Sequence, residues 1–259
     1  MKKALFHFLT RNRNKTINRF IQGKVDFISD AHSNINNDHK TNGELWIQKK
    51  AIDSGFKIFF DVGANKGEWS KNLFSLSPNI EVYAFDPNPD VFFKLDELSN
   101  ISNLTASQLA LADTEGEEEF SINLSNSIFS SFYRRTDFTD SQTIKVEKIR
   151  GDSYCELKDI SKIDFLKIDV EGFEFSVLNG FLKKLESNEI GLIQFEYGVM
   201  NIHSRTFLKD FYDLLIPFGF KVGKLFPTSI EFLKYDYSME NFKWANYVAV
   251  HSSVINKFI

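Results

Sequence analysis

From residue 44 onward, short apolar runs alternate with stretches in which apolar residues recur every three or four positions. The short runs are bounded by polar or turn residues and predict strands at 57–62, 81–86, 104–111, 163–170 and 189–197. The helical spacing between and after them predicts helices at 44–53, 66–76, 90–98, 173–186 and 206–219. Strands that alternate with helices in this way predict a mostly parallel sheet with helices on both faces.

Two further pairs of strands depart from this alternation. The runs 117–124 and 143–149 alternate polar and apolar residues around a polar loop, and this pattern is typical of half-exposed strands. The runs 220–226 and 245–251 close the chain with no helical pattern between them, so we expect an antiparallel pair there.

The N-terminal 43 residues differ in character from the rest, so we predict a basic helical extension and linker at 1–43 and a catalytic domain at 44–259. The first 24 residues hold seven Lys or Arg and no acid. Their apolar positions, which fit one or two amphipathic helices, are Leu5, Phe8, Leu9, Ile17, Phe20 and Ile21. Packing of these helices on the domain is the first expectation, and contact of residues 1–24 with a membrane surface is the alternative.

Composition narrows the function classes. The net charge of −4 and the pI of about 5.8 disfavour a nucleic-acid binder, which is usually basic. Cys155 is the only cysteine, as is common in the reducing cytoplasm, where we expect the protein to work. No apolar run approaches the roughly 18 residues of a membrane span.

The segment "DVGANKG" joins the first predicted strand of the domain to its helix. Asp61 ends the strand, and Gly63 and Gly67 would let a ligand approach the backbone beside the helix N-terminus. The turn lacks the middle glycine that admits a pyrophosphate in dinucleotide sites. Asp86 ends the second strand, 19 residues after Gly67, where a carboxylate can accept both hydroxyls of a ribose. A ribose without a pyrophosphate favours S-adenosylmethionine over a nicotinamide dinucleotide.

Five segments occur in this order and at a spacing that resembles the FkbM family of S-adenosylmethionine-dependent methyltransferases. They are "FFDVGANKGEWS", "YAFDPNPDVFFKL", "LALADTEGEEEF", "IDFLKIDVEGFEFSVLNGF" and "IQFEYG". The resemblance runs from about residue 57 to residue 195, and "LKIDVEGFE" is its most specific part. It does not cover the basic N-terminus.

The resemblance implies a Rossmann-like class I methyltransferase fold, in which a seven-stranded, mostly parallel sheet has an antiparallel last strand. It also implies methyl transfer to a hydroxyl oxygen of a small molecule such as a sugar, a glycan, a lipid or a polyketide. The cofactor contacts that it implies are Asp61, Gly63, Ala64, Asn65, Gly67, Asp86, Ala110 and Asp113.

Methyl transfer to a hydroxyl group needs a base for the hydroxyl proton. Lys167, Asp169 and Glu171 are spaced two apart and share one face if the strand continues to Glu171, and Glu196 ends the next strand. We expect Asp169 to be the base and its negative charge to favour the cationic cofactor, with His203 as a weaker candidate. No metal is predicted, although hard oxygen ligands at a strand end would suit Mg²⁺.

The loop 127–135 lies where we expect the acceptor to bind. Ser130 and Ser131 are candidate contacts there, and Arg134 and Arg135 could hold an anionic acceptor. Two other functions stay open. One is a nicotinamide-dependent oxidoreductase, which the missing middle glycine and the absence of a Tyr-x-x-x-Lys pair disfavour. The other is a non-catalytic binding protein that retains the fold.

Overall fold

The computed structural model describes residues 2–101, 103–125, 130–133 and 140–259. Its main sheet has eight strands in the order β10-β9-β11-β8-β7-β1-β2-β3. The strands are β1 Ile58–Val62, β2 Glu81–Phe85, β3 Leu104–Ser107, β7 Ile163–Ile168, β8 Ile190–Tyr197, β9 Phe220–Phe226, β10 Ser229–Phe232 and β11 Ala245–His251. The five strands from β3 to β8 pair in parallel, whereas β11 runs antiparallel to both β8 and β9.

The predicted mostly parallel α/β fold with an antiparallel last strand is therefore confirmed, with one strand more than the seven expected. The extra strand is β10, which pairs with β9 as a hairpin in which Phe226 faces Ser229. Its four residues alternate between exposed and half-buried positions, and so short a run gives no clear periodic signal in the sequence.

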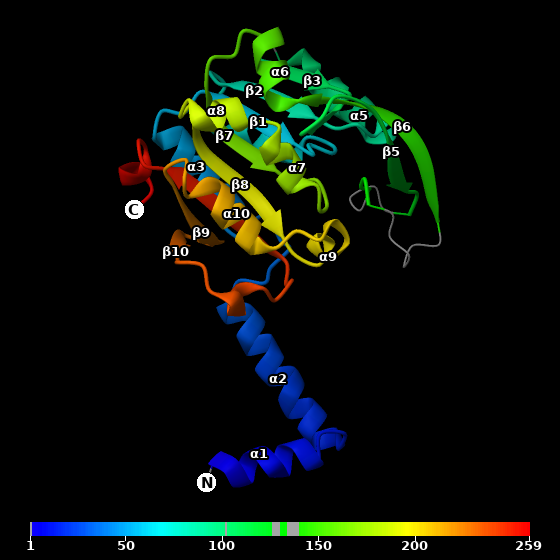
Figure 1. Cartoon of the computed structure of the whole chain (residues 1–259), viewed down its shortest axis with the longest axis vertical. Helices are drawn as coiled ribbons and strands as arrows, with labels where there is room; N and C mark the ends of the chain where they lie inside the picture. The colour runs from blue at the N-terminus through cyan, green and yellow to red at the C-terminus, as the bar shows by residue number, and fades with distance from the viewer. Residues whose placement is uncertain (1, 102, 126–129, 134–139) are drawn as a thin grey trace.

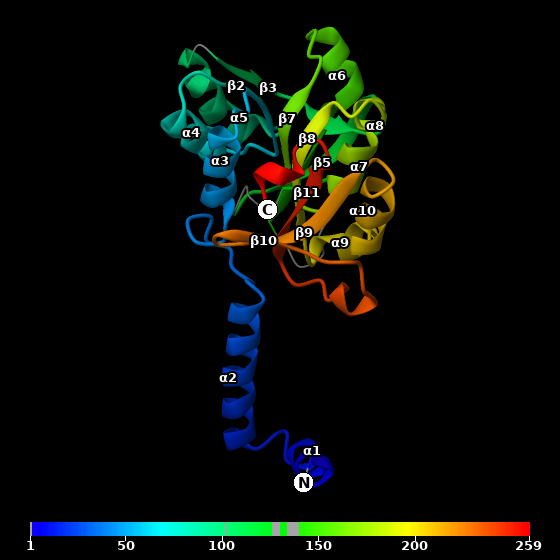
Figure 2. The same ribbon diagram turned by 90° about the vertical axis from the view of Figure 1, so that its left-hand side faces the viewer.

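Helices cover both faces of the main sheet. On one face lie α3 Glu44–Asp53, α4 Glu68–Leu76 and α5 Pro89–Asp96; on the other lie α6 Gly151–Leu157, α7 Glu174–Asn179, α8 Leu182–Glu186 and α10 Leu208–Leu215 (Figure 2). The first group packs Ile47 and Leu73 against strand residues such as Phe59. The second packs Phe181 and Phe211 against the opposite face. Burial on both faces explains why the central strands read as continuous apolar runs.

Two predicted elements are divided in the structure. The predicted strand at 104–111 becomes β3 in the main sheet and β4 Ala110–Ala112 in a second, three-stranded sheet of order β4-β6-β5. The other two strands of this sheet, β5 Gly116–Asn123 and β6 Ser141–Arg150, are the half-exposed strands that the alternation of polar and apolar residues predicted. The predicted helix at 173–186 is interrupted at Gly180. The second sheet approaches the chain closely there, and a side chain at this position would meet the Ala112 carbonyl oxygen.

The N-terminal segment forms two helices, α1 Lys2–Arg11 and α2 Thr16–His32, which extend away from the body of the molecule (Figures 1 and 2). No residue of α1 is buried, and in α2 only Asn18 is. The expectation that these helices pack on the domain is therefore wrong for this structure. Among the described residues, no helix combines the length and the apolar composition needed to cross a membrane.

Candidate active site

A cavity of about 790 Å³ opens at the carboxyl ends of β1, β2, β7 and β8. In parallel sheets ligands bind at this edge, where the strand order reverses. The predicted site residues in its wall are Gly63, Ala64, Asn65, Asp86, Ala110, Ser130, Lys167, Asp169, Glu171 and Glu196. Asp61, Gly67, Asp113 and His203 do not line it.

Contacts within the chain also require the two glycines of the turn. Gly63 has a φ of +78°, and a Cβ there would lie 1.8 Å from the backbone oxygen of Asp169. Gly67 has a φ of +75°, and a Cβ there would press against the side chains of Leu95 and Leu98. Of the two, only Gly63 lines the cavity, where a ligand could approach it. The chain itself leaves no room, because the turn crosses the end of β7 and α4 begins against Leu95 and Leu98.

Asp86 joins the glycine turn to the turn after β2. Its Oδ2 accepts a hydrogen bond from the backbone N–H of Asn65 (2.8 Å), and its Oδ1 accepts one from Asn88 (2.9 Å). Burial raises the pKa of Asp86 to about 6, against the lowering effect of these two bonds. Each carboxylate oxygen keeps a lone pair, so Asp86 can still accept hydroxyl donors from a ligand in the cavity.

Asp61 and Lys167 form a buried ion pair beneath the turn. Lys167 Nζ lies 3.2 Å from Asp61 Oδ1 and 3.3 Å from Asp169 Oδ2. Asp61 also accepts a hydrogen bond from Ser70 Oγ at 2.7 Å. Burial alone would lower the pKa of Lys167, but the carboxylates of Asp61, Asp169 and Glu44 raise it above its ordinary value. Lys167 therefore stays protonated at neutral pH and is unsuited to act as a base.

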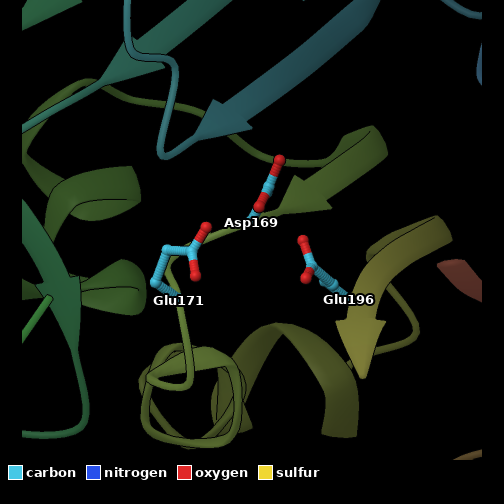
Figure 3. Close-up of side chains that lie close together, drawn as sticks. All are labelled: Asp169, Glu171 and Glu196. Atoms are coloured by element: carbon cyan, nitrogen blue, oxygen red, sulfur yellow. The ribbon is translucent and has the colours of Figure 1, made fainter. Parts of the chain in front are cut away.

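Three carboxylates converge at the ends of β7 and β8. Asp169, Glu171 and Glu196 each place an oxygen so that all three oxygens lie within 4.8 Å of one another (Figure 3). Burial and the negative charges of Asp169 and Glu171 raise the pKa of Glu196 well above its ordinary value. Such a group can hold a shared proton, or a divalent cation through its oxygen atoms.

The arrangement of this cluster depends on a tight turn after β7. The strand ends at Ile168, so Glu171 reaches the cluster from the turn, with a φ of +55°, and not from a continued strand face. The buried Glu174 closes the turn, because its Oε1 accepts the backbone N–H groups of Val170 (3.1 Å) and Gly172 (3.0 Å). Burial raises the pKa of Glu174 to about 7.

The other predicted contacts fall into two groups. Ala110 and Ser130 line the cavity, and the buried Ser131 donates its hydroxyl to the Glu171 carbonyl oxygen at 2.8 Å, which supports the same turn. The carboxylate of Asp113 instead accepts a hydrogen bond from Ser176 Oγ at 2.8 Å, outside the cavity wall. The predicted anion contacts Arg134 and Arg135 lie outside the described residues.

Helix α3 contributes cavity residues that were not predicted. Glu44 and Gln48 lie one turn apart on the helix face that also buries Ile47 and Ala51, and both line the cavity. Gln48 Oε1 and Trp69 Nε1, both in lining residues, have no hydrogen-bond partner among the described residues. The signal that could have revealed Glu44 and Gln48 is a pair of polar residues at i and i+4 on an otherwise apolar helix face.

Comparisons with known proteins agree on one family. The profile of the methyltransferase FkbM domain matches residues 61–221, more than half of the chain. The hexuronic acid methyltransferase AglP of Haloferax volcanii is 31% identical over 144 residues, which cover 55% of this chain and 57% of that protein. The 2-O-methyltransferase NoeI of Sinorhizobium fredii is 25% identical over 191 residues, or 67% of this chain and 76% of that protein.

The match to AglP thus spans little more than half the length of that relative. A crystal structure of methyltransferase FkbM from Methylobacillus flagellatus covers 76% of this chain and 44% of its own, with 14% identity and a TM-score of 0.49. The profile match includes the glycine turn, Asp86 and the carboxylate cluster described above. The chain belongs to the FkbM methyltransferase family.

Proposed function

We propose that the protein transfers a methyl group from S-adenosylmethionine to a hydroxyl oxygen of a sugar or a sugar-containing acceptor. The observation that carries the proposal is the pairing of two features across one cavity. Asp86 and the glycine turn line one side, and the carboxylate cluster of Asp169, Glu171 and Glu196 lies at the ends of β7 and β8.

The residues present fit this cofactor. The carboxylate of Asp86 offers acceptors for ribose hydroxyls, and the backbone of Ala64 and Asn65 lines the cavity just before α4. The N-terminus of α4 favours an anionic group such as a carboxylate. Apolar side chains around Ala110, including Leu109, Leu111 and Phe132, can enclose a flat aromatic base. When bound, S-adenosylmethionine supplies an electrophilic methyl carbon on a sulfonium.

We propose that Glu196 is the base that accepts the proton of the acceptor hydroxyl. The sequence favoured Asp169 for this role. Asp169 is already paired with the Lys167 ammonium, which lies 3.3 Å from its Oδ2. Glu196 forms no ion pair among the described residues, and burial beside two acids raises its pKa. A raised pKa makes a carboxylate a stronger base, so it binds the proton of a hydroxyl group more tightly than an ordinary carboxylate does. Lys167 and Glu174 act as positioning residues for the cluster.

The acceptor class comes from the family relatives. AglP is described as acting on a hexuronic acid, and NoeI as a 2-O-methyltransferase. The carboxylates of Glu171 and Glu196 suit a polyhydroxylated acceptor, because they accept hydrogen bonds from hydroxyl groups. Trp244, which also lines the cavity, offers an aromatic face for a sugar ring.

The experiment is a methyl-transfer assay with tritium-labelled S-adenosylmethionine. Wild-type protein and the Glu196→Gln variant would be incubated with hexoses, hexuronic acids and the corresponding deoxy sugars. We expect label in a hydroxylated sugar with the wild-type protein, and loss of transfer when the accepting hydroxyl is absent from the sugar. Transfer to none of these sugars, with S-adenosylhomocysteine still bound, would reject the acceptor class while keeping the cofactor site.

We also propose that residues 44–259 form the catalytic unit and that the enzyme works in the cytoplasm. The thiol of Cys155 is buried, and burial raises its pKa to about 12, so it is not a reactive thiol. A lone, unreactive cysteine fits a reducing compartment. Truncation to residues 44–259 and measurement of S-adenosylhomocysteine binding test the boundary. The truncated protein should still bind, although more weakly than the full-length protein, because it lacks Asn37 and His39 of the cavity wall.

A further inference from the structure

The two N-terminal helices expose a large apolar surface. We call the segment from Lys2 to His32 the N-terminal arm; it comprises α1, α2 and the turn between them (Figure 1). Ten of its apolar side chains are exposed, from 39% for Leu9 to 72% for Phe27; they are Leu5, Phe6, Phe8, Leu9, Ile17, Phe20, Ile21, Val25, Phe27 and Ile28. Exposed aromatic and aliphatic groups in such a cluster mark an interaction surface.

These side chains gather on one face of each helix. In α1 the residues Leu5, Phe6, Phe8 and Leu9 are linked by i, i+3 and i, i+4 spacings, and in α2 the residues Ile17, Phe20, Ile21, Val25 and Ile28 are linked in the same way. Polar residues occupy the opposite faces, and nothing in the described part of the body packs against either apolar stripe. The arm is thus amphipathic along its length, and its apolar face has no partner within the described residues.

The charge distribution indicates what the partner is. Residues 1–24 carry seven Lys or Arg and no acid, whereas the chain as a whole holds 31 cations and 35 acids. The arm has two acids nearer the body, Asp26 and Asp30, so the chain beyond the arm has 24 cations against 33 acids and is acidic. An acidic body is repelled by an anionic surface, so attraction to such a surface must come from the arm.

The arm joins the body next to the cavity. Asp30, in the last turn of α2, forms an ion pair with Lys243 at 2.6 Å, and the adjacent Trp244 lines the cavity. Beyond the arm, Asn34 donates hydrogen bonds to the backbone oxygens of Asn42 and Leu225, which fastens the connecting segment to the sheet edge. His39 of this segment also lines the cavity.

We propose that the N-terminal arm is an anchor that inserts its apolar face into the interface of an anionic lipid membrane. The basic residues contact the lipid headgroups, and the phenylalanine, leucine and isoleucine side chains enter the boundary of the acyl chains. Because the arm joins the body at the cavity wall, this anchor holds the active site close to the membrane surface.

The test is co-sedimentation of the full-length protein with lipid vesicles. Vesicles of phosphatidylcholine with 30% phosphatidylglycerol, on the order of a typical anionic content, are compared with pure phosphatidylcholine. We expect binding to the anionic vesicles, at least about tenfold weaker binding to the neutral ones, and weakening by 0.5 M salt, which screens the headgroup charge.

Two double variants distinguish the contribution of the arm to vesicle binding from that of exposed apolar side chains elsewhere. The variant Phe6→Gln/Phe20→Gln should lose vesicle binding at least about tenfold, because the apolar face is interrupted in both helices. The control Phe93→Gln/Leu157→Gln changes two side chains of the body that are each 70% exposed, and it should bind like the wild type. S-adenosylhomocysteine titration of each variant reports whether the body remains folded.

Light scattering in the absence of lipid tests the alternative that the apolar face of the arm binds a second copy of the chain. A dimer that the Phe6→Gln/Phe20→Gln change dissociates, together with no vesicle binding by the wild type, would overturn the proposal. Equal binding of the wild type and this variant would overturn it too, since binding would then not use the arm.

Discussion

Replacement of Lys167 by Met should destabilise the protein strongly, because Lys167 neutralises buried acids. Its ammonium lies 3.2 Å from Asp61 and 3.3 Å from Asp169, and Asp61 is wholly buried. Met keeps the length and apolar stem of the side chain, so the main loss is the charge. The variant leaves the carboxylate of Asp61 without its cation inside the protein.

Removal of one partner from a buried ion pair costs about 3–5 kcal/mol of stability. For a chain of this size about 1 kcal/mol lowers the Tm by roughly 2–4 °C, so we expect a fall on the order of 10 °C. An exposed pair provides the control. Lys183 lies 2.7 Å from Glu156 with 69% of its side chain exposed, so solvent screens this pair and Lys183→Met should leave the stability close to that of the wild type.

The assay is urea denaturation followed by circular dichroism, applied to the wild type, Lys167→Met, Lys183→Met and the double variant Asp61→Asn/Lys167→Met. The double variant should recover part of the loss, because Asn removes the unpaired buried charge. Wild-type stability of Lys167→Met, combined with loss of methyl transfer, would refute the structural role of Lys167 and restore it as a candidate base.

Three further predictions concern the cavity wall. Glu196→Gln should lower kcat by a factor of roughly 10²–10⁴, the usual contribution of a general base. The Kd of S-adenosylhomocysteine should stay within about threefold of the wild-type value. An unchanged kcat would show that another group accepts the proton. Gly63→Ala should unfold the protein or lower its Tm far more than Gly55→Ala does. Both glycines have φ near +80°, but only a Cβ at position 63 would meet backbone atoms. Equal effects of the two substitutions would show that the structure relieves this clash. Burial raises the pKa of Asp86 to about 6 and that of Glu174 to about 7, so folding takes up protons between about pH 4.5 and 7. The free energy of unfolding should therefore fall by a few kcal/mol from pH 5 to pH 8, at about 1.4 kcal/mol per group and pH unit, and Asp86→Asn should reduce that slope.

Sequence patterns predicted the parts of this fold that depend on local periodicity. The central strands are apolar because both faces are covered, and each ends close to the polar residue that marked its boundary, such as Asp86 after β2. The position of Asp86 in the cavity wall followed from topology alone, because parallel strands end at one edge of the sheet.

Other features depend on contacts between segments that are distant in the sequence, so no periodic pattern in the sequence predicts them. The separation of β3 from β4 is set by the pairing of Ala110–Ala112 with β6, some 38 residues later in the register. Spacing placed Lys167 and Asp169 on one face, but it could not show that Asp61 lies within reach and keeps Lys167 protonated. For the same reason the sequence indicated space for a ligand at the glycine turn but could not show that Gly63 also makes room for the backbone of Asp169.

Calorimetric titration of S-adenosylhomocysteine is the most direct test of the central claim, that the cavity beside Asp86 binds the methyl donor. We predict a Kd of roughly micromolar, or about −8 kcal/mol, for the wild type. Asp86→Asn should bind at least about tenfold more weakly, and Asp113→Asn, whose side chain lies outside the cavity wall, should bind like the wild type. Equal affinity of all three proteins, or binding of NAD without binding of S-adenosylhomocysteine, would contradict the account.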